Sequence, residues 1–112
     1  MSKDVAALKS RYLSDPPAVQ IGGLASQLSR LGWFLKRSTA MEKLQPIIRE
    51  SKYFTEWAAD HASPDVQGVL AAIQLELAML ERQMTRGESP RGYIEHANSR
   101  AAQLLRLAGL RD

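Results

Sequence analysis

Two histidines and the carboxylates near them are the residues of this chain that could bind a metal ion. Glu56, Asp60 and His61 lie close together, and His96 lies further along the chain. However, His61 would point about 100° away from Asp60 on a helix, and neither histidine follows a glutamate at the three-residue spacing of helical di-iron sites. We therefore expect no metal site and no cofactor, with His61 beside a helix end and His96 partly exposed.

Residues for covalent or phosphate chemistry are not arranged in a catalytic pattern. The chain has no cysteine, which excludes a thiol nucleophile and a thiolate metal site. No serine lies in a Gly-x-Ser-x-Gly elbow, and the glycine pair Gly22-Gly23 is not followed by the Lys-Ser or Lys-Thr of a phosphate loop. We expect no catalytic residues and no enzyme activity. The glycine pair forms a hinge or, as the pattern favours, lets a neighbouring helix approach closely.

Glu76 is a carboxylate at the edge of an apolar stripe, between Val69 and Ala72 on the helical wheel. A carboxylate there must reach water, gain a proton or pair with a cation. Because glutamate is rarely buried, the simpler expectation is that Glu76 reaches water. The alternative is a structural ion pair with Arg100 or Arg106 of the last helix.

One cluster has the residue types that anchor protein interfaces, namely Arg30, Trp33, Phe34 and Arg37. Arg30 and Phe34 are four residues apart, as are Trp33 and Arg37, so each pair meets on a helix surface and can form a cation–π contact. The two rings either pack on the core, which we favour, or form a surface for a protein partner. Lys36 points about 100° away from Arg37, which argues against one basic patch for nucleic acid or an anionic surface.

The elements that must position these residues are helices, because the apolar residues recur at three- and four-residue steps and no strand signal is present. Capping residues before prolines and glycines after the periodic segments divide the chain. The expected caps are Asp15, Ser63 and Ser89, a capping box from Thr39 to Glu42, and left-handed Gly87 and Gly109. We predict an all-α fold, a single domain over residues 1–112. It is a compact bundle of four to five mostly antiparallel helices with short loops, near 3–14, 16–37, 40–62, 64–86 and 90–108.

Pro46 leaves the start of the third helix open to two interpretations. The helix could run through Pro46, with a kink and one missing backbone hydrogen bond. It could instead begin at Pro46, in which case residues 38–45 form a corner between two helices.

The second helix carries two stripes of side chains that predict close packing. The large apolar stripe comprises Ile21, Leu24, Leu28, Leu31 and Leu35, and the small stripe comprises Ala18, Gly22, Ala25, Ser29 and Gly32. Both stripes step by three and four residues, and they lie about 100° apart around the helix. A ridge of large side chains beside a smooth groove indicates that this helix packs on two sides.

The fourth helix is apolar on nearly all sides. Its main stripe comprises Val66, Leu70, Ile73, Leu77, Leu80 and Met84, and it is widened by Val69, Ala72 and Met79. Ala71, Leu75 and Ala78 form a second stripe on the far side. Because so small a domain has little room for a fully central helix, we expect Ala71, Leu75 and Ala78 to bind a second copy of the chain in a homodimer.

Composition and charge indicate an ordinary globular protein. Of the 112 residues, 45% are hydrophobic and 24% are charged, and the net charge is only +3. The first residues lack the apolar core of a signal peptide, and Arg30 interrupts the most apolar stretch, residues 18–35. We expect a cytoplasmic protein without a membrane span that acts as a protein–protein interaction module. Weak binding of nucleic acid or an anionic surface through the basic second helix is the alternative.

Overall fold

The computed structural model describes residues 3–37 and 40–109, and all regular structure in this part of the chain is helical. The helices are α1 (Lys3–Ser14), α2 (Pro17–Lys36), α3 (Met41–Ala59), α4 (Pro64–Thr85) and α5 (Arg91–Leu107). The all-α prediction is confirmed, and each helix end lies within three residues of its expected position. None of the helices described has the run of apolar residues that crossing a bilayer requires.

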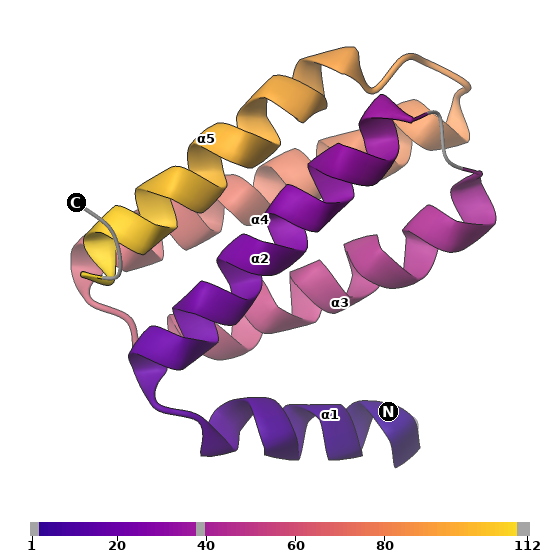
Figure 1. Cartoon of the computed structure of the whole chain (residues 1–112). Helices are drawn as coiled ribbons and strands as arrows, with labels where there is room; N and C mark the ends of the chain where they lie inside the picture. Colours follow the sequence, from indigo (N-terminus) through magenta and orange to yellow (C-terminus); the bar gives the residue numbers. More distant parts are fainter. Residues whose placement is uncertain (1–2, 38–39, 110–112) are drawn as a thin grey trace.

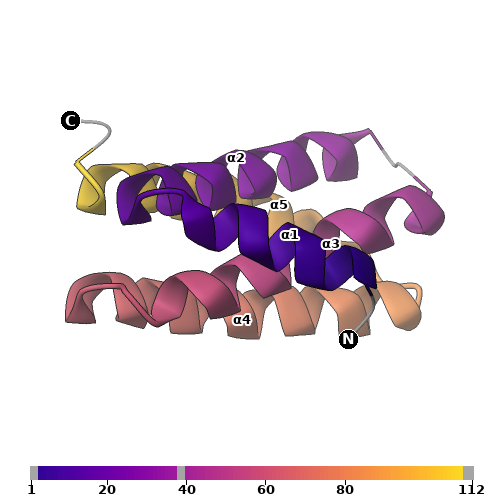
Figure 2. The same cartoon turned by 90° about the horizontal axis from the view of Figure 1, so that it is seen from below.

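Helices α2 to α5 form a four-helix bundle in which each runs antiparallel to the next (Figure 1). α2 contacts both α3 and α5, and α4 contacts the same two helices, so the four form a closed ring. α1 lies across one side of this ring and contacts α3 (Figure 2). The short connections favour this arrangement, because they leave each helix beside the one that precedes it.

The core combines the leucine ridge of α2 with the main stripe of α4, as predicted. Its members from these helices include Ile21, Leu24, Leu28, Leu31, Leu35, Val66, Leu70, Ile73, Leu77 and Leu80. The smooth side of α2 faces α5, where a Cβ built on Gly32 would lie 3.2 Å from the Cβ of Ala97. The predicted close approach therefore occurs at Gly32. It is wrong for Gly23, where a Cβ would only touch the ring of Tyr12 at 4.0 Å.

Tyr12 holds α1 against the bundle. Its ring stacks on Phe54 of α3 with 4.2 Å between ring centroids, and its hydroxyl donates a hydrogen bond of 2.6 Å to the carbonyl of Gln20. Burial raises the pKa of Tyr12 well above its usual value, and the negative charge of Asp15 raises it further. One aromatic side chain therefore ties the first helix to both α2 and α3.

Several helix ends follow the predicted capping chemistry. The side chain of Ser63 accepts a hydrogen bond of 3.5 Å from the N–H of Val66 at the start of α4. Gly87 and Gly109 have φ angles of 74° and 75°, the left-handed conformation expected after α4 and α5. Thr39, the first residue of the expected capping box, lies outside the described residues.

Two helix starts next to prolines differ from the prediction. Asp15 does not cap α2, because Pro16 occupies the N-cap position and is followed by a second proline, so the carboxylate has few N–H groups to accept from. Instead, the Gln20 side chain donates to the Asp15 carbonyl at 2.9 Å. α5 begins at Arg91, one residue later than expected, and Ser89 accepts from the Arg91 N–H at 3.3 Å.

The structure decides between the two interpretations of Pro46. α3 begins at Met41 and continues through Pro46, which is exposed. The carbonyl that loses its helical partner belongs to Glu42, an exposed residue of the first turn, where water can replace the missing N–H. At its other end α3 stops at Ala59, so His61 lies in the turn before α4 and not in the helix.

Candidate functional site

The four residues Arg30, Trp33, Phe34 and Arg37 come together at the C-terminal end of α2, where Arg37 is the C-cap, and we call them the α2 cluster. The guanidinium carbon of Arg37 lies 3.5 Å from the centroid of the Trp33 ring, and its Nη1 donates to the Trp33 carbonyl at 3.0 Å. The guanidinium carbon of Arg30 lies 5.6 Å from the centroid of Phe34. Both predicted cation–π contacts are therefore present.

The two rings of the α2 cluster differ in burial, so the favoured prediction that both rings pack on the core is wrong for Trp33. Phe34 is partly buried and packs against the core, whereas Trp33 is 50% exposed. The rings meet edge to face, with centroids 5.0 Å apart and planes at 87°. Phe34 thus anchors the cluster to the bundle, and Trp33 is displayed on the surface.

Every charged side chain on α2, the helix that carries the α2 cluster, is positive. α2 contains no acidic residue, and within the described residues neither Arg30 nor Arg37 pairs with a carboxylate. Lys36 lies apart from the cluster, because it lines a separate hollow of about 540 Å³ together with Arg91 and Glu95 of α5. The two arginines therefore leave donors available to a partner.

The second candidate surface is the outward side of α4, formed by Ala71, Leu75, Ala78 and Met79, which we call the α4 face. All four residues are exposed, Leu75 to 63% and Met79 to 50%. The first three were predicted to lie together on this side. Met79 was expected to widen the core stripe instead, and that expectation is wrong. It lies four residues after Leu75, so helical geometry places it beside Leu75 on the outer side.

A hollow of about 300 Å³ lies beside the α4 face, between α4 and α5. Leu75 and Met79 form part of its rim, while Tyr93 and His96 line it from α5. The α4 face therefore presents a protruding apolar side chain and a depression next to each other.

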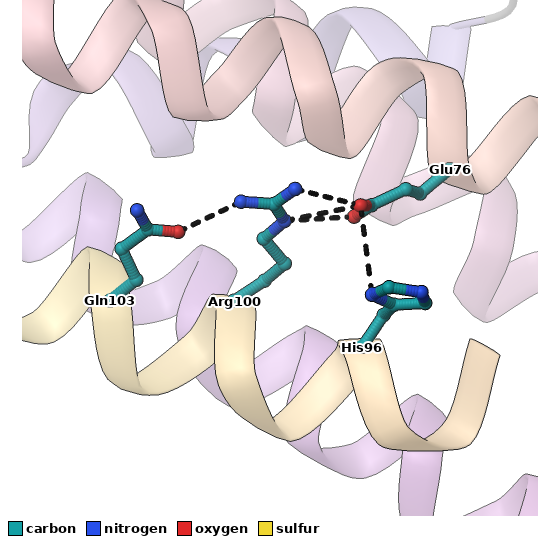
Figure 3. Close-up of polar contacts among 4 residues, drawn as sticks. All are labelled: Glu76, His96, Arg100 and Gln103. Carbon is teal, nitrogen blue, oxygen red and sulfur yellow. Dashed lines mark hydrogen bonds and ion pairs between the residues drawn. The ribbon is translucent and has the colours of Figure 1, made fainter. Parts of the chain in front are cut away.

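Glu76 forms an ion pair with Arg100 across α4 and α5 (Figure 3). Nη2 of Arg100 donates to Glu76 at 2.8 Å, and Nε donates to both carboxylate oxygens at 3.0 and 3.2 Å. Nη1 of Arg100 donates to Gln103 at 2.9 Å. The hydrogen bond to Glu76 raises the pKa of Arg100. The alternative interpretation of Glu76, a structural ion pair, is thus confirmed, with Arg100 and not Arg106 as the partner.

The Glu76 carboxylate also affects two residues at the hollow. Nδ1 of His96 lies 4.0 Å from Glu76, although the His96 side chain is largely exposed. Burial raises the pKa of Tyr93, and the negative charge of Glu76 raises it further. These contacts satisfy the charge of Glu76 within the chain, which fits a structural role for that carboxylate.

The residues first considered as metal ligands lie on the surface. Glu56, Asp60 and His61 are each exposed at the end of α3. The described residues contain no group of three histidine, aspartate or glutamate side chains placed to hold a metal ion. Comparisons of the chain with protein-family models, curated proteins and solved structures gave no match.

One inter-helix contact was not predicted from the sequence. Lys52 of α3 forms an ion pair of 2.8 Å with Glu81 of α4, and the Gln74 side chain donates to the Lys52 carbonyl at 3.1 Å. No local pattern signals this contact, because its residues belong to different helices whose relative rotation only the packing decides.

Proposed function

We propose that this chain is a non-enzymatic cytoplasmic helical bundle that forms a homodimer through α4 and serves as a protein interaction module. The α4 face is the observation that carries the proposal. Leu75, at its centre, is 63% exposed, and Ala71, Ala78 and Met79 extend the apolar surface along the helix. A second copy covering this face would remove apolar surface from water, which is the main driving force of association.

Antiparallel pairing of two α4 helices suits this face. Leu75 lies at the middle of Pro64–Thr85, so a two-fold axis there would match the helices along their full length. With Leu75 of both copies meeting at the axis, the hollow lined by Met79 and Tyr93 lies beside that contact, where it can receive an off-axis side chain of the partner. The same pairing would bring Asp65 of the first turn near the partner's Arg82 in the last turn, which is a favourable charge arrangement.

Light scattering of the purified full chain tests the homodimer. The mean mass should rise from monomer towards dimer as the concentration increases from about 5 to about 500 µM, because association follows mass action. Leu75→Glu should remain monomeric throughout that range. Val19→Glu is the matched control, since Val19 is 51% exposed on α2, and it should dimerise like the wild type. A wild-type chain that is monomeric at about 500 µM would overturn the proposal.

Weak binding of nucleic acid or an anionic surface through α2 is the second candidate. It is favoured by Arg30 and Arg37, which have no carboxylate partner within the described residues. It predicts an affinity that falls steeply with salt and that is lost when both arginines are changed to glutamate. The separate position of Lys36 counts against it.

A further inference from the structure

The α2 cluster has a chemistry that specifies a partner other than a second copy of the chain. We infer that it docks an acidic segment of another protein, in which two carboxylates flank a large apolar side chain. The apolar side chain covers Trp33, and the carboxylates pair with Arg30 and Arg37. This rests on the proposed interaction module and names the partner class of its second surface, but it does not require the dimer.

The cluster is already ordered before a partner binds. Trp33 is held on one face by the Arg37 guanidinium at 3.5 Å and at its edge by Phe34. Phe34 in turn packs against the core. Since a partner need not immobilise these side chains, little conformational entropy is lost on binding. Exposed tryptophan and arginine held in this way are typical centres of protein interfaces.

The two guanidiniums can accept carboxylates without breaking their internal contacts. A guanidinium carries five N–H donors. Within the described residues, Arg37 uses one of its nitrogens to reach the Trp33 carbonyl, and Arg30 makes no ion pair. A guanidinium matches the two oxygens of a carboxylate through paired hydrogen bonds. The partner must therefore supply negative charge at two positions.

The positions of the arginines set the spacing of those charges. The backbones of Arg30 and Arg37 are seven residues apart, about 10 Å along the helix axis. However, the guanidinium of Arg30 reaches forward to Phe34 and that of Arg37 reaches back over Trp33, so the two charges are closer along the axis than their backbones. Two carboxylates separated by one to two turns of a helix, or by two to three residues of an extended segment, have a matching spacing. Trp33 lies between the two arginines, so the apolar residue of the segment must lie between its two carboxylates.

The distribution of cations favours a protein segment over a polyanion. Nucleic acid and anionic membranes are bound by rows of cations along a surface. Here Lys36 lies in a different hollow, beside Glu95, and the whole chain has a net charge of only +3. Two arginines around one tryptophan form a compact site, which suits a short acidic segment better than a long phosphate backbone.

Selection from a display library of random peptides on the immobilised full chain, at physiological salt, tests the docking. The selected peptides should carry Asp or Glu on both sides of a large apolar residue. For a fluorescently labelled selected peptide, Arg30→Gln, Arg37→Gln and Trp33→Ala should each weaken binding about tenfold or more. Lys36→Gln is the matched control, an exposed cation of the same helix outside the cluster, and should change the affinity less than about twofold. Circular dichroism verifies that each variant folds.

Three results would overturn the inference. Selected peptides could lack paired carboxylates, or they could bind the Arg30→Gln/Arg37→Gln double variant as well as the wild type. A single-stranded oligonucleotide or a phosphatidylserine vesicle could also bind more tightly than any selected peptide and tolerate Arg37→Lys, which would assign the cluster to phosphate groups. The Leu75→Glu variant should bind the peptide like the wild type. Peptide binding therefore tests the docking site, and light scattering tests the dimer, independently of each other.

Discussion

The outer sides of α2 and α4 are both left exposed by the bundle, yet their chemistry differs. On α4, Leu75 and Met79 are 63% and 50% exposed among alanines. On α2, Trp33 is also 50% exposed, but a guanidinium lies 3.5 Å from its ring centroid. The first is bare apolar surface, whereas the second is aromatic surface already in contact with a cation.

This difference separates two kinds of recognition. Bare apolar surface gains free energy from any apolar cover, so shape and symmetry select its partner, and a second copy is the partner that we propose for it. Trp33 of the α2 cluster is covered on one face by Arg37. Among the described residues Arg30 and Arg37 have no carboxylate partner, which is why we infer a partner that brings carboxylates. The two regions also differ in whether their charged side chains are paired within the chain. The carboxylate near the α4 face, Glu76, is paired inside the chain with Arg100, while the α2 arginines face outward.

Removing the charge near α4 should therefore have the largest effect on stability. Glu76→Ala leaves the partly buried Arg100 without its carboxylate, and we expect the free energy of unfolding to fall by about 2 kcal/mol. Arg30→Ala, which removes an outward charge on α2, should change it by less than about 0.5 kcal/mol. Urea denaturation at low micromolar protein concentration measures both. Equal losses in the two variants would contradict the contrast between inward and outward charge.

Alkaline pH probes one buried tyrosine near the α4 face and one at the other end of α2 from the cluster. The pKa of Tyr93, at the α4–α5 hollow, and that of Tyr12, whose hydroxyl bonds the first turn of α2, are both raised, mainly by burial. In the unfolded chain tyrosine ionises near pH 10. Above about pH 10 the folded state holds protons that the unfolded state has lost. The free energy of unfolding should then fall with pH, with a slope that approaches about 1.4 kcal/mol per pH unit for each tyrosine as the unfolded state becomes fully ionised.

Single phenylalanine variants test this slope. Tyr93→Phe and Tyr12→Phe should each remove one tyrosine's share of the alkaline decline, measured by denaturation from about pH 8 to about pH 11. Tyr12→Phe should also lower stability at neutral pH by about 1 kcal/mol, because it loses the hydrogen bond to the Gln20 carbonyl. If a variant retains the full wild-type slope, the tyrosine that it lacks ionises as easily in the folded protein as in the unfolded chain.

Dimer formation through the α4 face should make stability depend on concentration. From about 5 to about 500 µM, the wild type should gain about 1 kcal/mol per chain, seen by calorimetry as a higher melting temperature. Leu75→Gln should lose this dependence, because it places an amide at the centre of the face. Trp33→Gln is the matched change on α2, where the side chain is also half exposed, and should keep it. If both variants behave alike, the two faces do not differ in self-association.

The helices and their inner faces could be predicted because their signals are local. Periodicity identified the ridge of α2, and Ser63 and Gly87 marked the ends of α4 through their own backbone contacts. The wrong predictions concern residues whose position depends on neighbouring residues or helices as well as on their own type. A second proline removed the N–H groups that Asp15 would have capped, and Met79 belongs by spacing to both the inner and the outer stripe, which only the packing of α4 separates.

In the candidate sites too, contacts within one helix could be predicted from the sequence, whereas contacts between helices could not. The pairing of Arg37 with Trp33 was predictable, because it depends on a four-residue spacing within one helix. The exposure of Trp33 was not, since it depends on where the other helices leave α2 uncovered. Likewise, an arginine partner for Glu76 was predictable, but the choice of Arg100 over Arg106 follows from the rotation of α5 relative to α4, for which the sequence has no local signal.

The smallest effect is expected from Arg37→Lys, which keeps the charge on α2 but removes the planar group over Trp33. The lost cation–π contact is worth about 0.5 kcal/mol at an exposed site, near the limit of denaturation measurements. Fluorescence is more sensitive, because Trp57→Phe leaves Trp33 as the single tryptophan. In that background Arg37→Lys should make Trp33 more accessible to acrylamide quenching, and the control Lys36→Arg should not. Unchanged quenching would mean that Arg37 does not cover the ring in solution, and the α2 cluster would then be as bare as the α4 face.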